Sequence, residues 1–338
     1  FCCAEPQSSL RFCATERGEF QESVPMEILR TPDERFVDLP DFGFEPRYAH
    51  VPLPDGETGS GPDSPQGTLR VAYLDEGPPD AAPVVLMHGE PSWSFLYRTM
   101  IPVLVDRGHR VIAPDLVGFG RSDKPAALTD YTYARHVAWM GDLLIGQLDL
   151  RHATFFGQDW GGLTGLRVVA ANPERFDRIV VGNTGLPDGT GRITEAFLNW
   201  QRFSQETEDF PVGFIINGGC ATDLAADVIA AYDAPFPDPS FKAGARIFPT
   251  LVPTTPDDPG GIANAEAWKV FEQWTKPVLC AFSDEDMITK GGAKPFMERI
   301  PGAHGQPHVT IEGGGHFLQE DRGPELARVI ADFVDATS

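Results

Sequence analysis

Positive charge is scarce in this sequence of 338 residues. Lysine and arginine together number 27, of which only six are lysine, whereas aspartate and glutamate number 49, so the formal net charge is −22. Nucleic acids and anionic membrane surfaces attract basic proteins. We therefore expect neither nucleic acid nor a membrane among the partners of this chain. The acidic, lysine-poor composition is compatible with a saline habitat and equally with a GC-rich genome.

Long apolar runs, paired cysteines and cofactor fingerprints are missing as well. No run approaches the roughly 20 apolar residues that a membrane-spanning helix needs. The cysteines are five, an odd number, and three of them crowd the start of the chain, which does not suggest a disulfide framework. The sequence contains no His-Glu-x-x-His, no Cys-x-x-Cys and no dinucleotide-binding glycine fingerprint. We therefore expect no metal and no organic cofactor.

Residues 1–25 lack both the basic segment and the apolar stretch of a secretory signal. A sequence more typical of a globular protein begins at Met26. We expect residues 1–25 to be a non-native or disordered extension, and we expect the protein to be cytoplasmic.

The rest of the sequence is built from short apolar stretches and segments of helical spacing. Stretches that predict strands lie at 35–39, 47–51, 69–74, 83–87, 110–113, 153–156, 178–181, 277–282 and 309–311. Continuous apolar runs such as 83–87 are typical of strands buried on both faces. Helices are predicted at 133–148 and 163–171, and a helix at 324–334 closes the chain. This alternation predicts an α/β fold with a mostly parallel central sheet and helices on both faces.

One part of the chain breaks this alternation. Residues 186–274 contain helix-like pieces, many prolines and no convincing strand. We interpret them as a helical cap inserted between the two parts of an α/β core, 26–185 and 275–338. A cap at this point would cover the carboxyl ends of the strands, where open α/β sheets bind their ligands.

The segment Gly157-Gln158-Asp159-Trp160-Gly161-Gly162 lies between a predicted strand and a predicted helix. Strand, tight glycine-flanked turn and helix are the setting of the nucleophile elbow of α/β-hydrolases, whose usual sequence is G-x-S-x-G. Here Asp159 takes the nucleophile position, so a serine esterase is disfavoured. A carboxylate is ionised near neutral pH and needs no base to activate it. A base in this site would instead activate water to hydrolyse an ester formed on Asp159.

Two further groups follow strand ends, in the chain order nucleophile, acid, histidine that α/β-hydrolases share. The histidine is His316, in a glycine-rich turn before the last helix. The acid is one of three adjacent carboxylates, Asp284, Glu285 and Asp286, and spacing alone does not choose among them. An imidazole in such a site takes a proton from water while a carboxylate holds its other nitrogen.

Backbone donors are expected on both sides of the nucleophile. In this fold the oxyanion hole comes from the amide after the nucleophile and from the loop after an earlier strand, which here are the amides of Trp160 and Glu90. The side chain of Glu90 is as compatible with a salt bridge or a water contact as with a catalytic part. We interpret His88 as a residue that braces the loop rather than as a second base.

Four segments together resemble the haloalkane dehalogenase family: HGEPSWSFLYR at 88–98, GQDWGG at 157–162, SDED at 283–286 and GHFLQE at 315–320. The likeness extends from Met26 to the C-terminus. It is to the branch that takes its acid from the loop after the strand following the cap, which implies Asp286. In these enzymes an aspartate displaces halide from a saturated carbon, and histidine-activated water hydrolyses the alkyl ester. The resemblance thus implies conversion of haloalkanes and water to alcohol, halide and a proton.

A departing halide needs hydrogen-bond donors, and an indole N–H is a donor only. By the resemblance, Trp160 matches the first halide-binding tryptophan of the family and Trp200 matches the second, which comes from the cap. The resemblance also implies that Phe197 lines the same pocket. Trp200 is compatible with a packing role in the cap, and Trp268 and Trp274 are candidates of the same residue type.

Two other functions remain as alternatives. An epoxide hydrolase shares the fold and the aspartate nucleophile but needs a pair of cap tyrosines and usually has an aromatic residue where this chain has Glu90; residues 186–274 contain only Tyr232. A non-catalytic ligand-binding protein on a hydrolase scaffold is the alternative from another class, since fold does not determine function. The presence of every triad member weighs against it. We expect a monomer or a small homo-oligomer.

Overall fold

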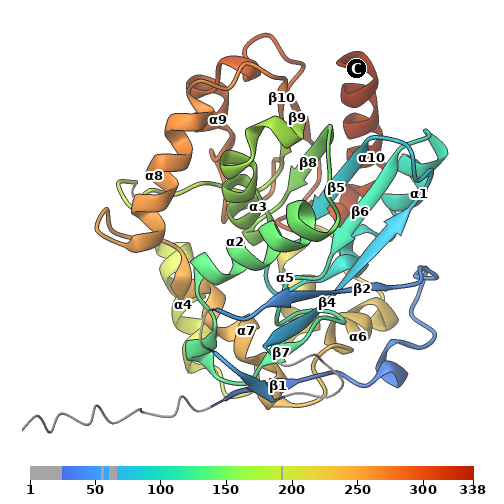
Figure 1. Cartoon of the computed structure of the whole chain (residues 1–338), viewed down its shortest axis with the longest axis vertical. Coiled ribbons are helices and arrows are strands. Elements are labelled where there is room, and N and C mark those ends of the chain that lie inside the picture. The colour runs from blue at the N-terminus through green and yellow to red at the C-terminus, as the bar shows by residue number, and fades with distance from the viewer. Residues whose placement is uncertain (1–24, 55–56, 61–66, 192) are drawn as a thin grey trace, which may run out of the picture.

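The computed structural model describes residues 25–54, 57–60, 67–191 and 193–338 (Figure 1). The expected extension at 1–25 lies outside the described residues apart from residue 25. Among the described residues, no helix combines the length and the apolar character that crossing a bilayer requires.

A central sheet of eight strands organises the molecule, in the order β11-β10-β9-β8-β5-β6-β4-β2. Its strands are β2 (Arg47–Pro52), β4 (Thr68–Glu76), β5 (Pro83–Met87), β6 (Arg110–Pro114), β8 (Ala153–Gly157), β9 (Phe176–Val181), β10 (Val278–Ser283) and β11 (Val309–Ile311). β4 is antiparallel to β2 and to β6, and the remaining neighbours are parallel. Every residue of β5 and β8 is buried, as their unbroken apolar sequences predict.

Helices cover both faces of this sheet (Figure 1). The core helices are α1 (Ile101–Asp106), α2 (Tyr133–Gly141), α3 (Trp160–Ala171), α9 (Ala293–Arg299) and α10 (Leu318–Ala336). α2 packs on α3 beside β8, whereas α1 packs on α10. The predicted α/β architecture, a mostly parallel sheet with helices on both faces, is therefore confirmed.

Between β9 and β10 the described residues form helices and no strand. These helices are α4 (Glu195–Glu206), α5 (Val212–Gly219), α6 (Ala226–Asp233), α7 (Ala243–Ile247) and α8 (Pro259–Phe271). α5 packs on α6 and α4 on α7, whereas α8 packs on the core helix α3. The segment leaves the sheet at the carboxyl end of β9, next to the turn that follows β8.

Two local predictions differ from the structure. The strand expected at 35–39 is wrong, because Asp33–Phe36 form a short 3-10 helix whose Phe36 ring packs edge-on against Trp93. The last helix begins at Leu318 rather than at residue 324, and Arg322 departs from helical geometry inside it.

A second, small sheet in the order β3-β1-β7 was not expected from the sequence. It comprises β1 (Met26–Leu29), β3 (Gly59–Ser60) and β7 (Lys124–Pro125). Strands of two to four residues carry too little alternation to be recognised, and β1 pairs with residues far along the chain.

Candidate active site

Asp159 occupies a strained turn between β8 and α3. Its backbone has φ 50° and ψ −128°, which is unusual for a residue other than glycine. The turn is tight: a Cβ on Gly161 would lie 1.9 Å from the Met87 carbonyl oxygen, and one on Gly162 would lie 2.0 Å from Thr184 Oγ1. The glycines of the elbow are therefore required by the close approach of its neighbours.

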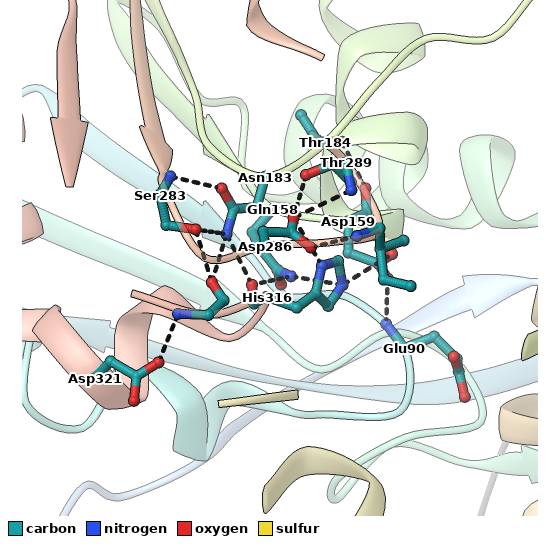
Figure 2. A network of polar contacts seen from close by, with 12 residues as sticks. Glu90, Gln158, Asp159, Asn183, Thr184, Ser283, Asp286, Thr289, His316 and Asp321 are labelled. Atoms are coloured by element: carbon teal, nitrogen blue, oxygen red, sulfur yellow. Dashed lines mark hydrogen bonds and ion pairs between the residues drawn. The ribbon is translucent and has the colours of Figure 1, made fainter. Parts of the chain in front are cut away.

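The loops after three strands bring Asp159, Asp286 and His316 together (Figure 2). His316 Nδ1 lies 3.1 Å from Asp286 Oδ2, and His316 Nε2 lies 3.5 Å from Asp159 Oδ2. Of the three adjacent carboxylates, Asp286 is the one that contacts the imidazole. Asp284 instead accepts a hydrogen bond from the Gly313 amide at an exposed position, and Glu285 is exposed.

Asp286 and His316 perturb each other's pKa. Burial alone would lower the pKa of His316, but the charges of Asp286 and Asp159 outweigh it and raise this pKa to about 10. Burial would likewise raise the pKa of Asp286, but the charge and hydrogen bond of His316, together with Thr289 and the Ile288 amide, lower it to about 2. In the free site the imidazole is therefore held as an imidazolium between two carboxylates.

The other oxygen of the nucleophile meets a backbone donor. The Glu90 amide donates to Asp159 Oδ1 at 2.8 Å, and Trp160 is the first residue of α3, at the positive end of the helix dipole. His88 braces this loop, since Leu116 N donates to its Nε2 at 2.9 Å while its Nδ1 lies 2.9 Å from the Gly89 carbonyl oxygen. Both ring nitrogens of His88 are thereby occupied.

The side chain of Glu90 is a buried carboxyl group beside the nucleophile. It is only 4% exposed, and its Oε1 has no hydrogen-bond partner among the described residues. Burial, followed by the negative charge of Asp159, raises the pKa of Glu90 well above its usual value. Both effects favour the protonated, neutral form of this carboxyl group.

Two cavities meet at the nucleophile. One, of about 440 Å³, is lined by Asp159, His316, Trp160, Trp200 and Phe197 among others, and the other, of about 520 Å³, shares Asp159, Trp160 and Phe197 with it. Trp200 also stacks on Phe203, so it has a packing contact besides its place in the cavity wall.

Of the other two tryptophan candidates, Trp268 lines the 520 Å³ cavity and Trp274 lies away from both cavities. The indole N–H of Trp268 donates to the Leu186 carbonyl at 2.8 Å and is thereby occupied. Trp274 lines a separate pocket between α8 and the 3-10 turn at Pro173–Arg175.

Comparison with known proteins agrees with this geometry. The family model described as alpha/beta hydrolase fold matches residues 82–323. A haloalkane dehalogenase of Psychrobacter cryohalolentis is 56% identical over 309 residues, covering 91% of this chain and 98% of its own length. One from Mycolicibacterium paratuberculosis is 48% identical over 311 residues, covering 92% and 99%. The tetrameric structure of haloalkane dehalogenase DpaA from Paraglaciecola agarilytica NO2 superposes with a TM-score of 0.79 at 35% identity, covering 89% and 97%.

This chain belongs to the haloalkane dehalogenase family. As a haloalkane dehalogenase it is a hydrolase that acts on carbon–halogen bonds, and the resemblance drawn from its four sequence segments is confirmed.

Sequence reasoning missed Asn183, a residue that joins the loops of this dehalogenase site. It is fully buried after β9, with φ 42°. Its side-chain amide donates to Ser283 Oγ at 2.7 Å and to the Gly315 carbonyl at 2.8 Å. Its backbone carbonyl accepts from the Asp159 amide at 2.9 Å. Asparagine tolerates a positive φ better than most residues, but no local sequence pattern reveals which loops it joins.

Gln158 was missed as well, although it precedes the nucleophile. Its side-chain nitrogen donates to the His316 carbonyl at 3.1 Å and lies 3.2 Å from His316 Nε2. It therefore contacts the imidazole on the side that faces Asp159.

Proposed function

We propose that the protein hydrolyses haloalkanes to alcohol, halide and a proton through an alkyl ester on Asp159. The observation that carries this proposal is the position of the Asp159 carboxylate where two cavities meet, with Oδ1 held by the Glu90 amide at 2.8 Å. This contact leaves Oδ2 as the attacking atom. A bond forms from Oδ2 to the substrate carbon as the carbon–halogen bond breaks, and the halide leaves with the bonding electron pair.

The halide is held by the indole N–H groups of Trp160 and Trp200. Both side chains line the 440 Å³ cavity together with Asp159. No lysine or arginine of the described residues lines that cavity, so apart from His316 the hydrogen-bond donors available for the anion are neutral. An indole N–H in a largely apolar pocket suits a weakly hydrated anion such as bromide.

His316 then activates water to hydrolyse the ester. It takes a proton from water through Nε2 while Asp286 stabilises the resulting imidazolium through Nδ1. Negative charge that develops on Asp159 Oδ1 meets the Glu90 and Trp160 amides. Esterification removes the charge of Asp159, one of the two that raise the pKa of His316. The imidazole therefore loses its proton more readily in the intermediate than in the free site, and it becomes a base when one is needed.

The test is a direct assay of bromide and proton release from 1,2-dibromoethane and 1-bromobutane, beside a styrene oxide hydrolysis assay. We expect bromide and acid in equal amounts. Diol from the epoxide without bromide would instead favour an epoxide hydrolase. The position of the one cap tyrosine argues against that reaction, because Tyr232 is fully buried and its hydroxyl donates to Glu320. The absence of product in both assays would favour a non-catalytic ligand-binding role.

We further propose that the chain forms a small homo-oligomer. The related dehalogenase DpaA, which shares 35% identity, is described as tetrameric. Size-exclusion chromatography with light scattering tests this proposal, and a mass of one chain across the micromolar range would contradict it.

A further inference from the structure

The first turn of α10 joins the cap to the core at two consecutive residues. Glu320 accepts hydrogen bonds from Arg98 at 2.5 and 2.8 Å and from the hydroxyl of Tyr232 on α6. Asp321 faces a different part of the cap, the loop that follows α5. This second junction lies beside the turn that carries His316 (Figure 2).

Four donors converge on the Asp321 carboxylate. Oδ1 accepts from the amide of Thr222 at 2.9 Å and from its hydroxyl at 2.6 Å. Oδ2 accepts from the amide of Ala221 at 2.9 Å and from the amide of Gly315 at 2.8 Å. One side chain thus connects the cap loop to the residue directly before the histidine.

The backbones on the two sides of this junction are in direct contact. The His316 amide donates to the carbonyl of Gly219, the last residue of α5, at 2.6 Å. A Cβ on Gly315 would lie 2.5 Å from that carbonyl oxygen and 2.7 Å from the Ala221 nitrogen. The same cap residues, Gly219 and Ala221, line the 440 Å³ cavity with His316.

We propose that Asp321 is a positioning residue, which sets the place of His316 relative to Asp159 by tying its turn to the cap. The inference rests on the proposed function, in which His316 is the base of the second step. His316 Nε2 has to hold a water molecule within reach of the ester carbonyl carbon, and a displacement of about 1 Å can cost about a hundredfold in rate. Asp321 acts on the imidazole through its hydrogen bond to the amide of Gly315, the residue before His316.

The consequence is selective for one step of the reaction. Formation of the ester uses Asp159 and the halide donors and needs no base, whereas hydrolysis of the ester needs His316. In Asp321→Asn one of the two oxygens becomes an NH₂ group, which faces N–H or O–H donors and cannot accept from them. We expect ester hydrolysis in this variant to slow by about tenfold or more, with ester formation changed by less than about threefold.

Rapid-quench kinetics with 1,2-dibromoethane separates the two steps. Intact-mass analysis at steady state measures the fraction of enzyme present as alkyl ester, which should rise in Asp321→Asn. The matched control is Asp332→Asn on the same helix, which removes a carboxylate paired with the exposed Arg107. Thr222→Val removes only the hydroxyl donor to Asp321 and should give a smaller rise in the ester fraction. It replaces Asp321→Asn as the test variant if that variant does not fold.

Hydrogen–deuterium exchange supplies a readout independent of turnover. Exchange in peptides covering 219–222 and 313–317 should be faster in Asp321→Asn than in the wild type and in Asp332→Asn. An unchanged ester fraction, or an equal loss of both steps, would overturn the positioning role. Absence of bromide release from the wild type would count against the proposed function alone, and unchanged exchange in both peptides would count against the junction itself.

Discussion

At the scale of the residue, the substitution of aspartate for serine at the elbow changes the task of the histidine. A serine needs a base to attack, but an ionised carboxylate does not. Asp159 lies beside His316, with its Oδ1 already held by the Glu90 amide. In the proposed mechanism the imidazole is therefore free to act on water after Asp159 has reacted.

Replacing the base should trap the intermediate. His316→Phe is expected to form the ester on Asp159 and to stall there, because displacement of halide needs no proton acceptor. Intact-mass analysis after incubation with 1-bromobutane should show an adduct of one butyl group. Asp159→Ala is the control and should show none. Substrate binding without any adduct in His316→Phe would contradict the two-step scheme.

Removing one indole donor should weaken halide binding. A hydrogen bond to a charged group contributes about 1.5–3 kcal/mol, so Trp200→Phe should raise the dissociation constant of bromide by roughly tenfold or more. The measurement is quenching of tryptophan fluorescence by bromide. Trp274→Phe, in a separate pocket, is the matched control. An unchanged affinity in Trp200→Phe would refute its assignment as a halide donor.

The buried Glu90 carboxyl predicts a pH dependence for the first step. Burial and the charge of Asp159 raise the pKa of Glu90, so its carboxyl group ionises at a higher pH than an exposed glutamate does. Ionisation places a second negative charge beside the departing halide, so the rate of ester formation should decline as the pH rises and Glu90 ionises. Glu90→Gln mimics the neutral form and should keep the rate of that form while losing the alkaline decline. The same alkaline decline in both proteins would exclude Glu90 as its cause.

At the scale of the elements, a buried ion pair ties α10 to the segment after β5, and a tyrosine of α6 joins it. Arg98 follows the 3-10 helix Ser94–Tyr97, and its guanidinium donates two hydrogen bonds to the Glu320 carboxylate on α10 in a bidentate pair. The side chains are only 6% and 3% exposed, so little solvent screens the pair. The hydroxyl of Tyr232 on α6 completes the contact and brings the cap into it.

Breaking this pair from one side should destabilise the fold. Arg98→Met leaves the Glu320 charge buried without its cation, which costs about 3–5 kcal/mol. Tyr232→Phe removes a single hydrogen bond to the Glu320 carboxylate and should cost about 1.5–3 kcal/mol. Denaturant unfolding monitored by fluorescence measures both. Glu266→Gln, whose pair with Lys269 is exposed, is the control and should stay within about 0.5 kcal/mol of the wild type. Equal stabilities of Arg98→Met and the wild type would contradict a stabilising role of the pair.

At the scale of the whole molecule, the net charge of −22 opposes compaction. Salt shortens the screening length from about 30 Å at 0.01 M to about 8 Å at 0.15 M. The melting temperature should therefore rise over this range in potassium acetate, a salt chosen because chloride would also occupy the proposed halide site. The rise should shrink as the pH approaches the isoelectric point of about 4.6. A flat or falling melting temperature would show that repulsion between negative charges does not measurably destabilise the fold.

The sequence alone determined those features that depend on local pattern. The strand at Pro83–Met87 lies where its apolar run predicts, because burial on both faces requires an unbroken apolar sequence. The elbow around Asp159 was likewise recognisable, since only glycine fits the close approach of Gly161 to the Met87 carbonyl. The roles of the acid, the base and the tryptophans remain predictions that the experiments above test.

Only the tertiary structure decided which distant groups meet. Spacing did not distinguish Asp284, Glu285 and Asp286, whereas the fold turns the last of them toward His316. Asn183 and Asp321 have no motif of their own, and their partners lie about a hundred residues away along the chain. Hydrogen bonds between loops depend on the relative position of whole strands and helices, and no period in the local sequence encodes that position.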